Sequence, residues 1–189
     1  MNPLRAVPTL ALLALTLTLT LALPAAAHPG HGADSGFQAG LLHPVTGIDH
    51  LLALLAVGLW SRQQQHGAVL APTFLILLAL GAASAGASHL PALELSIAAS
   101  VLLLGGLASC APSVQRRVAL SMAVLTVGAC AFVHGLAHGN ELSGTASGAG
   151  FMLASALVML AGALPGDVLR RRLGASIGTL GVILTAMAA

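Results

Sequence analysis

The feature that most constrains this chain is a series of apolar runs, each about as long as a bilayer is thick, with very few charges between them. Only 6% of the residues are charged and 57% are hydrophobic, and the mean hydropathy is +0.97. Soluble globular domains carry roughly 25% charged residues. The composition therefore predicts an all-α integral membrane protein. The basic charge rests on a few arginines, which gives no reason to expect a nucleic-acid partner.

The first 27 residues have the three parts of a secretory signal peptide. Arg5 supplies a positive charge, residues 10–23 form a short apolar stretch, and residues 25–27 provide an Ala-x-Ala cleavage site. We expect cleavage after Ala27, which leaves residues 28–189 as a single transmembrane permease domain that begins outside the cytoplasm. An uncleaved first helix is the alternative, and the Ala-x-Ala junction favours cleavage.

The rest of the chain divides into six apolar spans joined by short loops. A helix needs about 20 residues to cross the hydrocarbon core, and the hydropathy pattern places the spans at 37–60, 68–86, 92–109, 118–138, 147–164 and 173–189. Short loops make neighbouring helices antiparallel, so we expect one six-helix bundle. The first and fourth spans carry similar polar motifs in opposite orientations, the pattern of a 3+3 inverted repeat.

The arginines give an independent test of orientation, because cytoplasmic loops near helix ends carry an excess of Lys and Arg. Arg62 follows the first span, residues 116–117 follow the third, and residues 170–172 follow the fifth. These loops are therefore predicted to be cytoplasmic. The prediction agrees with an external N-terminus and returns the C-terminus to the outside. We expect a bacterial inner-membrane protein with both mature termini in the periplasm.

Two imidazoles and a carboxylate fall within the first span, whose sequence from His43 to His50 is HPVTGIDH. In a continuous helix, offsets of four and seven place His43, Gly47 and His50 on one face, with Asp49 beside that face. Ionisable groups are rare within a bilayer and usually face a bundle interior. Pro44 removes a backbone donor, a break that membranes tolerate where the freed groups line a buried cavity. Alternatively, His43 caps the helix and Pro44 is its first residue.

The fourth span ends with a second polar set, in the sequence CAFVHGLAHGNE from Cys130 to Glu141. Offsets of four and seven place His134, His138 and Glu141 on one stripe, provided that the helix continues past Gly139. The first span runs inward and the fourth outward. Both sets therefore lie between the outer surface and roughly the midplane, where we expect them to form one cation site.

Further candidates accompany these two sets. Glu94 begins the third span just inside the outer boundary. Cys130, four residues before His134, could add a thiolate, although a small residue that packs near the midplane is the simpler interpretation. His28 and His31 could capture metal with the free α-amine, and a tail beside the cleavage site explains them equally well.

The donor types favour a borderline divalent ion. Imidazole suits Zn, Cu, Fe and Ni, and its mixture with carboxylate argues against Mg and Ca. The absence of a Cys or Met cluster in the sequence argues against Cu(I). Chemistry alone leaves Ni(II), Co(II) and Zn(II) open. We expect the ion to be cargo, with no prosthetic group.

The two motifs also resemble a known signature pair. The pattern HPxxGxDH at His43 to His50, followed by FVHxxAHGxE at Phe132 to Glu141, resembles that of the HupE/UreJ family of nickel permeases. The resemblance covers essentially the whole mature chain, including Glu94 at the start of the third span. It implies uptake of nickel, or of cobalt in some members, for hydrogenase or urease maturation. It also implies metal handling by the histidines and carboxylates of both motifs.

The sequence thus predicts a permease and not an enzyme. The G-x-x-x-x-G-K-[ST] loop is absent, so the chain is not itself an ATPase, and no ATPase subunit is evident. One alternative is a membrane-embedded zinc hydrolase, which would use similar ligands and a bound water. Another is a non-transporting metal-binding subunit, which would be expected to carry a soluble region. The small residues Gly174 and Gly178 suit close helix packing, within the bundle or in a homo-oligomer.

Overall fold

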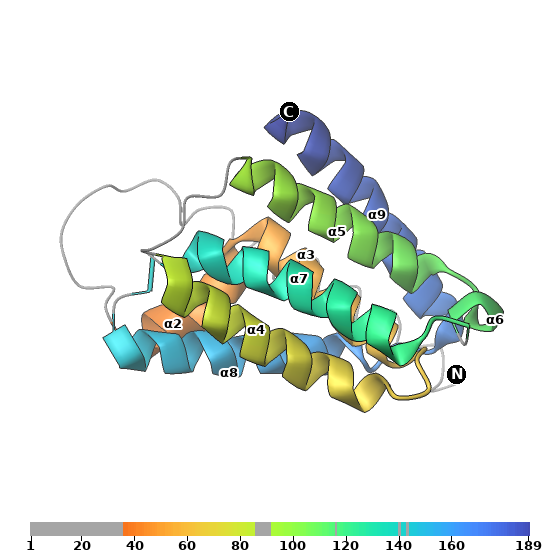
Figure 1. The fold of residues 1–189 in the computed structure, drawn as a ribbon, viewed down its shortest axis with the longest axis horizontal. Coiled ribbons are helices and arrows are strands. Elements are labelled where there is room, and N and C mark those ends of the chain that lie inside the picture. Colours follow the sequence, from red (N-terminus) through yellow and green to blue (C-terminus); the bar gives the residue numbers. More distant parts are fainter. Residues whose placement is uncertain (1–35, 86–91, 116, 140, 143) are drawn as a thin grey trace, which may run out of the picture. The chain divides into compact units, whose positions relative to one another are not determined.

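The structure is a computed structural model that describes residues 36–85, 92–115, 117–139, 141–142 and 144–189 (Figure 1). Within these residues every regular element is a helix. The expected signal peptide and the positions of His28 and His31 lie outside the described residues.

The helices follow one another along the chain and are joined by turns or short segments. In order they are α2 (Phe37–Thr46), α3 (Ile48–Ser61), the short 3₁₀ helix η2 (Gly67–Val69), α4 (Leu70–Ser84), α5 (Leu93–Ser109), α6 (Pro112–Gln115), α7 (Leu120–His138), α8 (Gly144–Gly162) and α9 (Asp167–Ala188).

Three helical segments are long and apolar enough to cross a membrane, namely Gly67–Ser84, α7 and α8. The pair α2 and α3 passes the same test together and makes a fourth if it forms one broken span. Helix α5 is apolar but has 17 residues, and α9 has 22 residues with an arginine-rich first half. The all-helical, apolar architecture is confirmed for the described residues, and the count of six spans stays a prediction.

The helices pack mainly in pairs, with α4 against α7, α5 against α9, and both α2 and α3 against α8 (Figure 1). The α4–α7 contact brings two backbones together, because a Cβ on Gly135 would lie 2.2 Å from the carbonyl oxygen of Leu78. A Cβ on Gly81 would lie 2.3 Å from the carbonyl oxygen of Phe132. Small residues at such crossings allow the close packing by which membrane helices associate.

The start of α9 differs from the start predicted by hydropathy. Helix α9 begins at Asp167, six residues before the predicted span, and so includes the three arginines. Asp167 and Arg170 form an ion pair one turn apart, with 2.8 Å between Oδ1 and NH1. Hydropathy identifies only the apolar part of a helix. An ion pair within the first turn also stabilises the helical conformation of the polar residues there.

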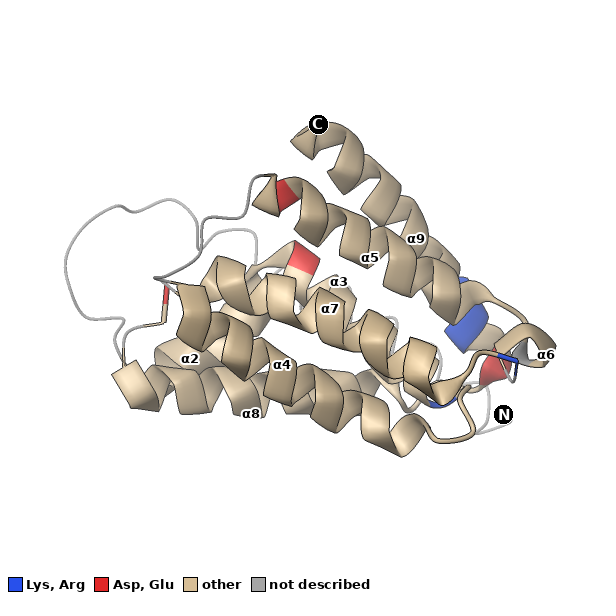
Figure 2. Cartoon of the chain, in the orientation of Figure 1, with Lys and Arg blue, Asp and Glu red and all other residues tan. Residues whose placement is uncertain are grey.

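Charged residues are unevenly distributed over the described part of the molecule. Arginines gather at the end of the helices near α6, in blue in Figure 2. Large apolar side chains such as Leu125, Leu160 and Met187 are exposed on α7, α8 and α9. An apolar outer surface with arginine at one end is typical of helices that face lipid and end in an aqueous layer.

Candidate metal centre

The first motif lies at a sharp break between two helices. The sequence pattern predicts one continuous helix over 37–60, and this is wrong, because α2 ends at Thr46 and α3 begins at Ile48, with a bend of 82°. Pro44 lacks a backbone donor, and Gly47 adopts extended dihedrals of φ −85° and ψ 109°. His43 therefore comes from the last turn of α2 and His50 from the first turn of α3.

Asp49 has a local role at this break. Its Oδ1 accepts a hydrogen bond from the backbone N–H of His50, at 2.7 Å. The first N–H groups of a helix have no partner within the helix, and a carboxylate in the first turn also interacts favourably with the helix dipole. Asp49 thus stabilises the start of α3 and holds the backbone of His50 in position.

The second motif lies at the end of α7. The single stripe required the helix to continue past Gly139, and this condition is not met, because α7 ends at His138 and Glu141 lies in the following turn. The backbone N–H of Glu141 donates to the carbonyl of His138 at 3.0 Å, so the turn folds back over the helix end. The carboxylate reaches His138 by this turn and not along a helical stripe.

Three side chains from both motifs form a first group, which we name the outer group: His43, His138 and Glu141. The Oε2 atom of Glu141 lies 3.1 Å from Nε2 of His43 and 2.9 Å from Nδ1 of His138. The two imidazole nitrogens lie 3.1 Å apart. Three atoms that can each bind a cation therefore converge on one point.

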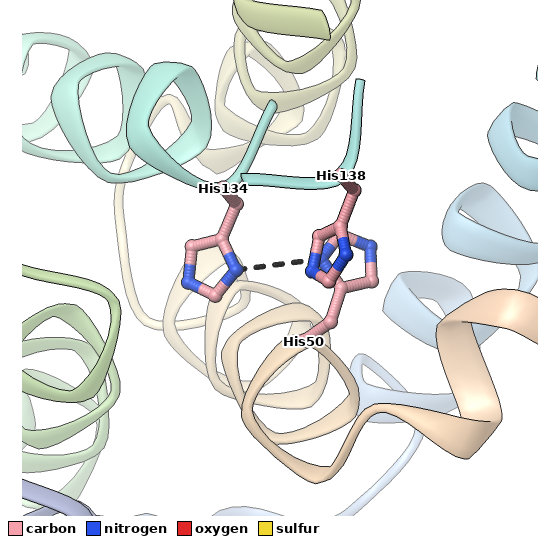
Figure 3. A group of neighbouring side chains, drawn as sticks. All are labelled: His50, His134 and His138. Atoms are coloured by element: carbon pink, nitrogen blue, oxygen red, sulfur yellow. Dashed lines mark hydrogen bonds between the residues drawn. The ribbon is translucent and has the colours of Figure 1, made fainter. Parts of the chain in front are cut away.

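A second group, which we name the inner group, consists of His50, His134 and His138 (Figure 3). His50 comes from α3 and the other two from α7, and the His50 ring meets the His138 ring edge-on, with 5.0 Å between the ring centroids. The Nδ1 atoms of His50 and His134 lie 3.4 Å apart, and both side chains are fully buried. His138 belongs to both groups, and its Nε2 is buried without a hydrogen-bond partner among the described residues.

Three residues that no sequence motif marks hold the imidazoles in place. Ser100 on α5 lies 2.8 Å from Nε2 of His134, Ser155 on α8 lies 3.4 Å from Nε2 of His50, and Phe151 stacks on the ring of His50 at 4.9 Å. Serines in apolar helices commonly bond to their own backbone. No local pattern therefore distinguishes Ser100 and Ser155 from the other serines of these helices.

Three other candidates, Asp49, Glu94 and Cys130, lie outside both groups. Glu94 is exposed in the first turn of α5. Cys130 is buried one turn before His134 on α7 and carries a free thiol in the apolar core. The structure brings four of the predicted histidines together with Glu141, and it does not bring Glu94 or Cys130 to them.

This arrangement supplies nitrogen and carboxylate donors within an apolar bundle. A neutral imidazole offers one lone pair to a metal ion, and a mixture of imidazole and carboxylate suits a borderline divalent transition ion. The groups come from α2, α3, α7 and the turn after α7, so the tertiary fold assembles them. Comparison with known proteins supports the family that the two motifs resemble. The family model described as "HupE / UreJ protein" matches residues 15–189.

The chain belongs to the HupE/UreJ family. It is also similar to "Protein HupE" of Rhizobium leguminosarum bv. viciae, with 36% identity over 161 residues, which cover 82% of this chain and 78% of that relative. No solved structure matches the chain. The family that the paired motifs predicted is thereby confirmed, and both motifs of this HupE/UreJ member contribute to one cluster of side chains.

Proposed function

We propose that the chain is a permease that imports a divalent transition metal ion through the outer and inner groups, with Ni(II) as the preferred ion and Co(II) as the next. The observation that carries the proposal is the convergence of four imidazoles and one carboxylate within an apolar bundle. Intramembrane ionisable residues are costly and mark ion pathways. Membership of a family associated with nickel and cobalt transport supports the same function.

The proposed topology has six spans after a cleaved signal peptide, with both mature termini in the periplasm of the bacterial inner membrane. The arginines after α3, around α6 and at the start of α9 would then face the cytoplasm, as the positive-inside rule requires. The outer group would lie toward the periplasm, since α7 begins beside α6 and ends at His138. The ion would thus enter at the end of the bundle opposite the arginines.

The exposure of the side chains supports this direction of entry. The side chain of Glu141 is 54% exposed and that of His43 is 24% exposed, whereas His50 and His134 are fully buried. A hydrated cation would meet a carboxylate first and neutral imidazoles later. Stepwise loss of water with moderate binding at each step is what conduction requires, because the ion must also leave.

Transport by purified protein in liposomes tests the proposal. We expect vesicles that contain the protein to accumulate Ni(II) above protein-free vesicles, and unlabelled Co(II) to compete better than Zn(II). Repeating the measurement with and without a pH gradient reports whether proton movement drives uptake. Failure to accumulate any of the three ions would contradict the permease assignment. Zinc-dependent hydrolysis of a peptide or ester substrate by the same preparation would favour the membrane hydrolase.

A further inference from the structure

The outer and inner groups share His138, which limits how an ion can move between them. Each group offers three donor atoms that lie within 4.8 Å of one another. The donor atoms of all five residues do not lie within that distance of one another. In a complex with bonds of about 2.1 Å, the most distant donors lie only about 4.2 Å apart. One ion therefore does not reach all five donors at once in this arrangement.

We propose that the metal ion occupies two successive stations, the outer group and then the inner group, and that His138 passes it from one to the other. This inference rests on the proposed function, and it adds an order of binding to it. The ion exchanges the carboxylate of Glu141 and the imidazole of His43 for the imidazoles of His50 and His134. His138 is a ligand at both stations. Because its Nδ1 faces the outer group, binding through Nε2 at the inner station would require the ring proton to move from Nε2 to Nδ1 as the ion leaves the outer station.

His138 makes the two stations mutually exclusive. A neutral imidazole has one nitrogen with a proton and one with a lone pair, so His138 binds a single ion at a time. Its Nδ1 faces Glu141 at 2.9 Å, and its Nε2 is buried with no partner among the described residues. A second ion cannot enter the outer station with full ligation until the first ion has left His138 entirely.

The spacing of the donors differs between the stations. Bonds of about 2.1 Å put neighbouring donors about 3.0 Å apart in an octahedron and about 3.4 Å apart in a tetrahedron. The three outer distances of 2.9, 3.1 and 3.1 Å match one face of an octahedron, which leaves three positions for water. In the inner group the Nδ1 atoms of His50 and His134 lie 3.4 Å apart, which is longer than each of the three outer distances.

Metal binding by the purified protein tests this without any need for transport. The full chain, with His28→Ala and His31→Ala so that those imidazoles do not bind the probe, is titrated with Ni(II) by equilibrium dialysis in detergent. X-ray absorption spectroscopy then counts the imidazoles bound to nickel. We expect one ion per chain with two or three imidazoles. Two ions per chain would overturn the proposal, and so would four imidazoles around one ion.

Two variants separate the stations. We expect Glu141→Gln to keep one ion with three imidazoles, and His134→Gln to keep one ion with two imidazoles and a carboxylate. Each should lower uptake at least about 10-fold, because each interrupts the transfer. The matched control His66→Gln, an exposed loop histidine, should change neither result. Identical coordination in both variants would overturn the proposal.

The same experiment distinguishes this inference from the proposed function. The unsubstituted protein could transport no ion and still bind one ion per chain with the expected numbers of imidazoles. That result would support the two stations and contradict the permease assignment. If it transports Ni(II) and shows four imidazoles around the ion, the permease assignment stands and the two stations fail. His138→Gln should lower the affinity for Ni(II) at least about 100-fold, because it removes a ligand from both stations.

Discussion

Ser100 on α5 accepts a hydrogen bond from the Nε2–H group of His134 on α7, with 2.8 Å between Oγ and Nε2. The hydroxyl proton of Ser100 is donated to the carbonyl of Ile97 at 2.7 Å, so the oxygen is left to accept. This assigns the proton of His134 to Nε2 and leaves the lone pair on Nδ1. That atom faces His50 in the inner group.

Removal of this serine should therefore weaken metal binding without removing a ligand. We expect Ser100→Ala to lower the affinity for Ni(II) about 10- to 100-fold, the range found when residues that orient a metal ligand are replaced. Ser96→Ala is the control, because Ser96 lies one turn earlier on α5 and bonds only to the carbonyl of Ala92. Equal affinities of the two variants in a nickel titration would show that Ser100 does not orient His134.

Asp49 should matter for the stability of the bend between α2 and α3. Its carboxylate accepts the backbone N–H of His50 at 2.7 Å, and loss of a hydrogen bond of this kind costs about 1–3 kcal/mol. We expect Asp49→Ala to lower the midpoint of thermal unfolding in detergent and Asp49→Asn to recover most of the loss, because the amide oxygen can accept the same hydrogen bond. An asparagine variant as unstable as the alanine variant would show that the charge of Asp49, and not this hydrogen bond, stabilises the bend.

Gly135 should be intolerant of even one methyl group. It lies between His134 and His138 on α7, and a Cβ there would come within 2.2 Å of the carbonyl of Leu78 and 2.7 Å of the nitrogen of Ala82. We expect Gly135→Ala to destabilise the protein by about 1–3 kcal/mol, as overpacking does, and to reduce nickel binding because α7 must shift.

Gly148→Ala on α8 is the matched control for this substitution, because a Cβ at that position has no atom within 4 Å. Alanine is favoured over glycine in a helix by about 1 kcal/mol, so the control should be neutral or slightly stabilising. Thermal unfolding of both variants provides the comparison. If Gly135→Ala were as stable as Gly148→Ala, the close α4–α7 contact would not position the histidines.

Much of the site could be predicted from the sequence, because the chemistry was carried by residue types that a bilayer disfavours. His43, His50, His134, His138 and Glu141 stand out in apolar runs, and all five belong to the two groups. Asp49 stands out in the same way and belongs to neither group. The predicted helical faces are wrong in detail, since the first helix is broken at Gly47 and α7 ends before Glu141. Periodicity assumes a continuous helix, and here a bend and a turn bring the donors together.

Other parts could not be predicted because they depend on which helices are neighbours. Ser100 and Ser155 act on histidines 34 and 105 residues away in the chain. Their sequence surroundings resemble those of serines that bond only to backbone, such as Ser96. Glu94 shows the opposite case, because a carboxylate at a helix start is favourable for the helix itself and needs no metal ion to explain it.

The most direct test of the account is nickel uptake into liposomes by three variants measured side by side: His134→Gln, His43→Gln and His66→Gln. His134 is buried in the inner group, His43 is partly exposed in the outer group, and His66 is an exposed loop residue outside both. We expect the first two to lose at least about 10-fold in initial uptake rate, and His66→Gln to stay within about twofold of the unsubstituted protein, as exposed substitutions usually do. Uptake by well-folded His134→Gln and His43→Gln at the rate of the His66→Gln control would contradict the claim that the ion passes through these histidines.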